Sequence, residues 1–165
     1  MTEDKFWEII GQSQAGHDAN AQIKALEKIL WGLGTDEVAA FDRIFTQLLI
    51  KSYTWDLWGA AYIIDGGCSD DGFEYFRRGL IASGREKFEK ALENPESLAD
   101  WTEPDEVENE GIKYVSYKVY EEKSGGGKMP DDGLRYPSNP SGEPWEEDND
   151  DLERRFPALW AKFSS

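Results

Sequence analysis

The chain has 165 residues, of which 39% are hydrophobic and 13% aromatic, and this suits one domain with a sizeable core. Its formal net charge of −16 argues against binding to nucleic acid or to an anionic membrane. The acidic first residues and the short apolar runs predict a soluble protein with neither a signal peptide nor a membrane span. Because Cys68 is the only cysteine, it cannot form an intramolecular disulfide, which fits a reducing, cytoplasmic compartment.

Apolar residues at helical spacing predict three helices in the first third of the chain. The first contains Phe6, and Thr2 stands where its N-cap is expected. The second follows Asp18, and the third follows a glycine break, with Thr35 as its expected cap. The other apolar positions of the three helices are Ile9, Ile10, Ile23, Leu26, Leu30, Leu33, Val38, Phe41, Phe45, Leu48 and Leu49.

The middle of the chain predicts a helix, a tight turn and a second helix. Trp55 and Trp58 belong to an apolar face wide enough for a helix that is buried on nearly all sides. Gly66 and Gly67 supply the left-handed backbone that ends a helix, and Ser69 is the expected N-cap of the next one. The residues that complete the two apolar faces are Leu57, Ala61, Tyr62, Ile63, Ile64, Phe73, Phe76 and Leu80.

The polar residues of the second helix allow two interpretations. Asp70 and Asp71 fall in its first turn, where negative charge opposes the positive end of the helix dipole. Glu74 is expected to pair with Arg77 and Arg78, three and four residues later, along or beside the exposed face. The functional alternative is that the three carboxylates hold a magnesium ion, and that the two arginines receive a phosphate or the carboxylate of a partner.

This central unit resembles the bacterial proteins grouped as the domain of unknown function 4240 family. The resemblance covers most of the chain. It implies the fold of that family, and it implies no activity, because the family has none assigned. The runs that carry it are Trp55–Trp58, Ala60–Ile64, Gly66–Phe73 and Tyr75–Arg78, together with Phe6–Trp7, Ala40–Arg43, Gly84–Arg85 with Phe88, Gly142–Trp145 and Phe156–Trp160.

Apolar spacing predicts further helices after the central unit. A short helix containing Phe88 is expected to stop at Asn94, because Pro95 disfavours helical backbone in the residue before it. A later helix is predicted from about Asp105 to Lys123. The last helical segment restarts at Pro157, a residue suited to the first position of a helix.

Residues 124–145 contain four of the seven prolines and five of the 16 glycines, and they show no periodicity. They predict a long irregular loop, which Tyr136 and Trp145 are able to attach to the rest of the protein. Its start, Ser124–Lys128, lacks the spacing of a phosphate-binding loop and is interpreted as a flexible connector. The fold class predicted for residues 1–165 is therefore all-α: one helical bundle with this loop near the C-terminus.

The negative charge is concentrated in two segments. Residues 93–110 contain eight acidic residues and no basic one, and residues 143–153 contain seven acidic residues and no basic one. The rest of the chain is close to neutral, with 19 acidic and 18 basic residues. Blocks of this kind are typical of a solvated face or of a segment that contacts a basic partner.

Three other features of the sequence are candidates for a metal-binding or catalytic site. Residues 146–151 are rich in carboxylates, but they lack the glycine and the final glutamate of a calcium-binding loop. His17 is the only histidine and is interpreted as a surface-turn residue. Cys68 precedes a helix N-terminus, which favours a thiolate, but the two following aspartates oppose this, so a structural cysteine is expected.

The functional hypothesis is an acidic protein-binding or regulatory module, of inhibitor or immunity type, that acts on a basic protein surface. The alternative is an enzyme that uses Asp70, Asp71, Glu74, Arg77 and Arg78 in acid–base or metal-assisted chemistry. No cofactor is expected, and the oligomeric state is left open. Trp55 and Trp58 are interpreted as core residues first and as a binding platform second. The candidate binding residues are Trp55, Trp58, Glu103, Asp105, Glu106, Glu146, Glu147 and Asp148.

Overall fold

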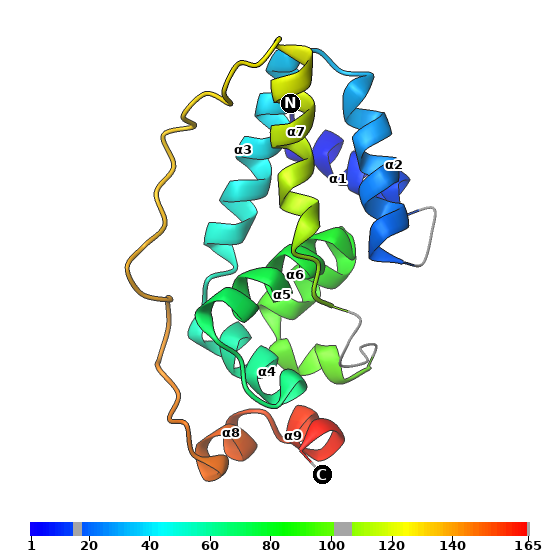
Figure 1. Ribbon diagram of the computed structural model, residues 1–165. Coiled ribbons are helices and arrows are strands. Elements are labelled where there is room, and N and C mark those ends of the chain that lie inside the picture. The colour runs from blue at the N-terminus through cyan, green and yellow to red at the C-terminus, as the bar shows by residue number, and fades with distance from the viewer. Residues whose placement is uncertain (15–17, 101–106, 165) are drawn as a thin grey trace.

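The computed structural model describes residues 1–14, 18–100 and 107–164 (Figure 1). Within these ranges every regular element is a helix, and one isolated parallel bridge joins Thr54 to Ser141, so the predicted all-α class is confirmed. The elements are α1 (Glu3–Ser13), α2 (Ala19–Trp31), α3 (Thr35–Lys51), α4 (Trp55–Asp65), α5 (Asp70–Ala82), α6 (Arg85–Glu93), η1 (Pro95–Asp100), η2 (Gly111–Lys113), α7 (Tyr114–Lys123), α8 (Asn149–Arg155) and α9 (Pro157–Phe163).

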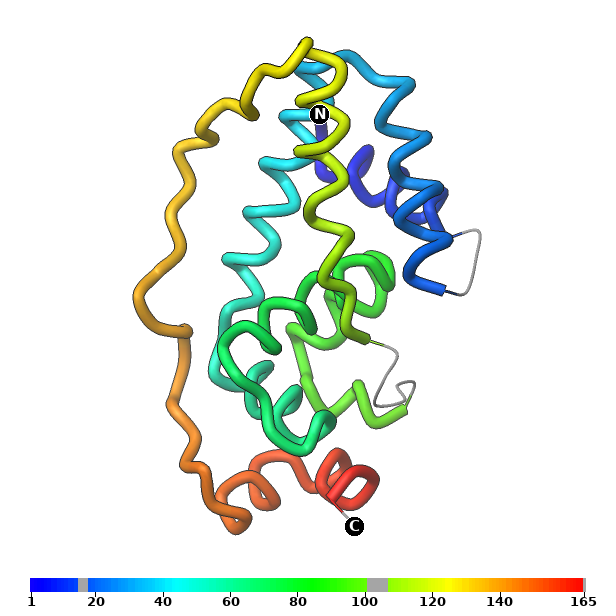
Figure 2. The backbone as a smooth tube through the Cα atoms, viewed as in Figure 1, coloured from blue at the N-terminus to red at the C-terminus, as the bar shows by residue number. Residues whose placement is uncertain are grey.

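Helices α1, α2, α3 and α7 form one end of the molecule. Helix α7 lies between α2 and α3 and packs against both (Figure 2). Phe6 of α1 is fully buried, and its ring lies 4.7 Å from that of Phe41 and 5.9 Å from that of Phe45, both in α3. These contacts belong to one hydrophobic core that continues through α4, α5 and α6 to Leu159 of α9.

Side-chain caps start several of the helices, as the sequence predicts. The Thr2 hydroxyl accepts a hydrogen bond from the Lys5 amide at 3.1 Å, and the Asp18 carboxylate accepts one from the Ala21 amide at 2.8 Å. The prediction for Thr35 was wrong in detail. Thr35 is the first residue of α3, and Gly34 stands at the N-cap without a side-chain hydrogen bond.

The helix predicted over residues 105–123 begins later than expected. Its described part starts with the short η2 turn at Gly111, and regular α-helix begins at Tyr114. Residues 107–110 instead lie against α5, where the Asn109 amide donates to the Tyr75 carbonyl at 3.2 Å. Packing on a neighbouring helix backbone has therefore replaced the helical hydrogen bonds of this segment.

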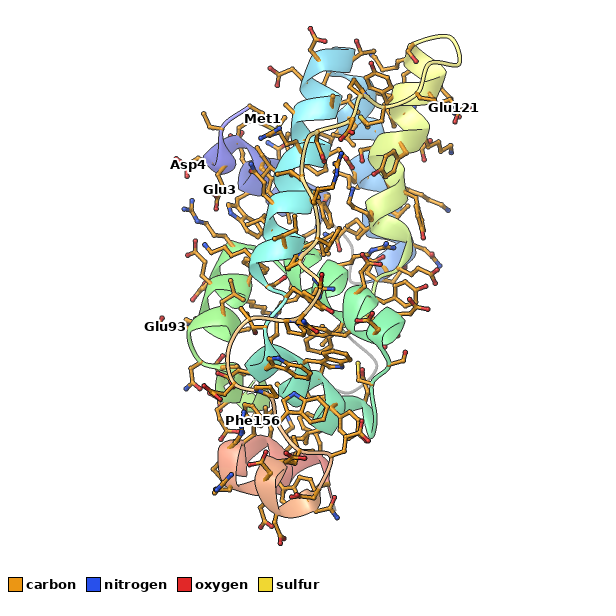
Figure 3. All side chains as sticks on the ribbon, turned by 90° about the vertical axis from the view of Figure 1, so that its left-hand side faces the viewer. Met1, Glu3, Asp4, Glu93, Glu121 and Phe156 are labelled. Carbon is orange, nitrogen blue, oxygen red and sulfur yellow. The ribbon has the colours of Figure 1, made fainter. Side chains whose placement is uncertain are left out.

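The predicted loop is an extended strap, defined here as residues 124–148, that connects α7 to α8. It runs along the side of α3 from near Glu121 to the end of the molecule that carries Phe156 (Figures 1 and 3). Arg43 donates to the Asp132 carbonyl at 2.5 Å, and the buried Trp145 donates through Nε1 to the Trp55 carbonyl at 2.8 Å. Between these points, the backbone of Ser141 pairs with that of residues 53 and 55.

Helices α8 and α9 close the end of the molecule opposite to the N-terminal helices (Figure 1). Pro157 is at the start of α9, as predicted. The Glu96 carboxylate of η1 accepts hydrogen bonds from the amides of Ala158 at 2.7 Å and Leu159 at 3.1 Å, so it caps this helix from another part of the chain. In the described part of the chain, no helix has both the length and the apolar character that crossing a membrane requires.

Candidate functional site

The turn between α4 and α5 places the first carboxylates of the candidate site. Gly66 has a φ of 68°, the left-handed conformation expected at a helix C-terminus, and the Gly67 amide donates to the Tyr62 carbonyl at 2.8 Å. The Ser69 hydroxyl accepts from the Gly72 amide at 3.1 Å, which confirms its predicted role as N-cap. Asp70 and Asp71 follow in the first turn of α5, and both are exposed.

Replacing Ser69 with alanine should lower the free energy of unfolding by about 1 kcal/mol, because the Gly72 amide loses its acceptor. Ser69→Asp keeps a capping oxygen and should retain most of the stability. Denaturant unfolding of both variants measures the difference. Equal stability of the alanine variant and the wild type would show that the hydroxyl does not cap α5 in solution.

A cleft of about 280 Å³ opens between the first turns of α5 and the strap. Four of the five residues weighed as catalytic candidates line it: Asp70, Asp71, Glu74 and Arg77. The remaining wall comes from distant parts of the chain, and it consists of Tyr53, Tyr136, Pro137 and Ser138. Tyr136 is the only aromatic residue between 124 and 144, and this is the sequence signal that could have identified it as a candidate for the cleft wall.

Arg77 is the innermost charged residue of the cleft. It is 3% exposed, so its predicted place on the exposed face of α5 was wrong. The guanidinium donates through Nη1 to the Leu49 carbonyl at 2.6 Å and lies 4.8 Å from the ring centre of Tyr53 and 4.6 Å from that of Phe73. Its Nε is buried and has no hydrogen-bond partner among the described residues. Burial also lowers the pKa of Arg77 below its usual value.

Arg78 is also buried, at 6% exposed, but it is not among the residues that line the cleft. Its guanidinium pairs with Glu74 at 3.1 Å, as predicted, and also donates to the Glu110 carbonyl at 2.7 Å. The ring centre of Tyr114 lies 5.0 Å from it. Both arginines were expected to be exposed because α5 is amphipathic, but α3 covers one side of the helix and residues 107–110 cover another.

The two tyrosines of the cleft have weakly acidic hydroxyl groups. Partial burial and the charge of Asp70 raise the pKa of Tyr53, whose hydroxyl lies 3.4 Å from an Asp70 carboxylate oxygen. Partial burial and the charge of Glu74 raise the pKa of Tyr136 to about 12. Both phenols therefore stay protonated at neutral pH and present hydrogen-bond donors to the cleft.

Trp55 and Trp58 lie beside the cleft, half-buried, in a row of stacked rings. The ring of Trp58 is 5.5 Å from that of Trp55 and 5.2 Å from that of Phe73, with nearly parallel planes. Trp145 of the strap packs edge-on against both tryptophans, at 5.9 and 6.1 Å. Their stacking faces are therefore used inside the protein, which favours the core interpretation of these two residues over a binding platform.

Cys68 is half-buried, and its carbonyl accepts a hydrogen bond from Trp58 Nε1 at 3.0 Å. Burial, together with the charges of Asp65 and Glu108, raises the pKa of its thiol to about 12. The thiol is therefore protonated at neutral pH, in agreement with the interpretation of Cys68 as a structural residue.

The acidic candidates outside the cleft have different positions. Glu103, Asp105 and Glu106 lie outside the described residues, as does His17. Glu146, Glu147 and Asp148 are exposed, and the Asp148 carboxylate caps α8 by accepting from the Asp151 amide at 2.7 Å.

Asp151, within the acidic run 146–151, has a structural role at the start of α8. Asp151 is buried, accepts from the Glu146 amide at 2.9 Å, and pairs with Arg154 and Arg155. Across residues 1–14, 18–100 and 107–164, no three histidine, cysteine or acidic side chains converge as metal ligands would. This holds for the cleft carboxylates and for residues 146–151 alike.

Comparison with known proteins adds a family and no activity. Residues 1–122 match the family model described as a protein of unknown function (DUF4240). The chain belongs to this family. No curated protein and no solved structure matches it. The matched region contains α1 to α6 and nearly all of α7, so it includes Tyr53 and residues 70–77 of the cleft, whereas the strap wall at 136–138 lies beyond it.

Proposed function

We propose that this family member is an acidic regulatory module that binds a basic protein surface. The observation that carries the proposal is a contact between part of the first acidic segment and the helix that follows the second, two regions far apart in sequence. Element η1, from the first segment, packs against α9, which follows the second. Glu96 accepts from the amides of Ala158 and Leu159, and Lys162 donates to the Ala99 carbonyl at 2.9 Å.

The surface at the end of the molecule that α8 and α9 close is called the acidic end, and it comprises five exposed residues: Asp100, Glu146, Glu147, Asp148 and Asp150. Glu146, Asp148 and Asp150 also line a shallow depression of about 310 Å³ together with Asp151 and Arg154. Because an excess of exposed negative charge raises the local concentration of positively charged partners, this arrangement favours fast, salt-sensitive association with a basic surface.

The test compares two variants that each neutralise four exposed acids. The first is Glu146→Gln, Glu147→Gln, Asp148→Asn and Asp150→Asn, in which asparagine at 148 still caps α8. The matched control changes Asp36, Glu37, Glu121 and Glu122 at the other end of the molecule, where Glu121 is labelled in Figure 3. Partners captured from the source cells are purified, and their association rates with each variant are measured at several salt concentrations.

We expect the first variant to slow association at low salt by about tenfold or more, and the control to leave it nearly unchanged. Raising the salt concentration to about 0.15 M, where charges are screened beyond about 8 Å, should reduce the difference between the variants. Equal rates for both variants, or partners that bind independently of salt, would contradict the proposal.

A further inference from the structure

The cleft beside α5 combines a buried positive charge with exposed negative charges. Arg77 is almost fully buried at its inner side, whereas Asp70 and Asp71 are exposed at the first turn of α5, and Glu74 is half-buried between them. A ligand in this cleft therefore meets a cationic donor deep inside and carboxylates nearer to solvent.

Arg77 is not neutralised by its neighbours in the way that a buried arginine usually is. None of the ion pairs formed by the described residues includes Arg77. The two nearest acidic groups are already engaged, since Glu74 pairs with Arg78 and Asp70 lies within reach of the Tyr53 hydroxyl. Arg77 lines the cleft, and its guanidinium donates to the Leu49 carbonyl but has no carboxylate partner among the described residues, so it is available to an anionic oxygen of a ligand.

A simple anion such as phosphate does not suit this cleft, because Asp70, Asp71 and Glu74 surround its approach with like charge. A ligand that pairs with both the buried guanidinium and the outer carboxylates carries a carboxylate and, a few atoms away, an ammonium group. We propose that the cleft binds a small zwitterion of the α-amino acid class, with its carboxylate toward Arg77 and its ammonium group toward Asp70 and Asp71 at the start of α5.

The walls and the size of the cleft agree with this ligand class. Its volume of about 280 Å³ lies at the lower limit of ligand pockets, which are about 300 to 1,000 Å³, and suits a ligand of amino-acid size. Tyr53 and Tyr136 supply aromatic rings that favour contact with a cation or an apolar side chain. The strap that contributes Tyr136 is attached on both sides of this residue, through the Asp132 carbonyl and through Ser141.

The proposal concerns a different surface from the acidic end and does not depend on a protein partner. Its experiment is a thermal-shift screen of the full chain with each standard L-amino acid at millimolar concentration, because a ligand that binds the folded state raises Tm. Isothermal titration then measures Kd for the amino acid with the largest shift. The same titration is run with its decarboxylated amine and with its N-acetyl derivative, each of which removes one of the two charges.

We expect the decarboxylated amine to bind about tenfold or more weakly than the intact amino acid, because it loses the ion pair to the buried Arg77. The N-acetyl derivative should bind a few-fold more weakly, because the carboxylates of Asp70 and Asp71 are exposed. Asp70→Asn with Asp71→Asn should weaken binding by a similar factor and keep the fold, because asparagine is tolerated at a helix start. The matched control is Asp36→Asn with Glu37→Gln, which removes the two acids from the first turn of α3 and should leave Kd unchanged.

Three results would overturn the proposal. An amine that binds as tightly as the parent amino acid would make the cleft a cation site, and an N-acetyl derivative that does so would make it an anion site. No Tm shift and no heat with any standard amino acid at millimolar concentration would show that the cleft is not a site for this class of ligand. Arg77→Lys provides a further test: it should weaken binding of the intact amino acid and leave binding of the decarboxylated amine unchanged.

Discussion

Replacing Gly79 with alanine should lower the free energy of unfolding by about 3 kcal/mol, an effect at the upper end for one added methyl group. Gly79 lies inside α5, and a Cβ built at this position would stand 1.2 Å from the carbonyl oxygen of Val107 and 3.1 Å from the amide nitrogen of Asn109. The neighbouring atoms are backbone and cannot turn aside as a side chain can. Residues 107–109 would have to move away from α5 and lose the bond from Asn109 to Tyr75.

Gly11→Ala is the matched control, because it adds the same methyl group to a helix where nothing lies within 4 Å. In α1 this change should stabilise the protein by about 0.5 to 1 kcal/mol, since alanine is the better helix former. Denaturant unfolding of the two variants measures both effects. If Gly79→Ala were as stable as Gly11→Ala, residues 107–109 would not lie against α5 in solution.

Replacing Asp42 with alanine should lower the free energy of unfolding by about 3 to 5 kcal/mol. Asp42 of α3 is 3% exposed, and one of its carboxylate oxygens accepts from Lys113 Nζ at 2.6 Å and from the Ser116 hydroxyl at 2.7 Å. Lys113 is 6% exposed, so removal of the carboxylate leaves an ammonium group buried without its counter-charge. The cost comes mainly from that unpaired charge.

The control for this prediction removes both partners. Asp42→Leu with Lys113→Met replaces the pair by apolar side chains, and it should recover most of the stability that Asp42→Ala loses. Thermal and denaturant unfolding of the single and double variants distinguish a loss caused by the unpaired charge from a loss caused by packing. A double variant as unstable as Asp42→Ala would mean that the loss comes from packing around α3 and α7 and not from the buried charge.

Features that depend on neighbours in the chain could be predicted from the sequence. The helical period of the apolar residues placed α1 to α6, because one turn of helix brings every third or fourth side chain to the same face. Thr2 and Ser69 were identifiable as caps because a cap bonds to an amide only three residues away. The irregular strap was predictable from its prolines and glycines, and the pairing of Glu74 with Arg78 from their separation of one helical turn.

Which part of the chain covers each face of a helix could be seen only in the folded protein. Periodicity marked Arg77 and Arg78 as residues of the polar face, but it cannot show that α3 and residues 107–110 bury that face as well. For the same reason the helix predicted from residue 105 begins only at η2 in the described part, since the Asn109 amide bonds to the Tyr75 carbonyl of α5.

The cleft itself joins Tyr53, the start of α5 and Tyr136, and no local pattern connects these parts of the chain. The buried pair of Asp42 and Lys113 is likewise a contact between α3 and the residue that precedes α7. Helical period and capping act over a few residues, whereas burial and charge pairing depend on which helices become neighbours. The sequence therefore identified the side of the cleft that α5 provides, whereas the walls at Tyr53 and Tyr136 and the buried pair of Asp42 and Lys113 became visible only once the chain was folded.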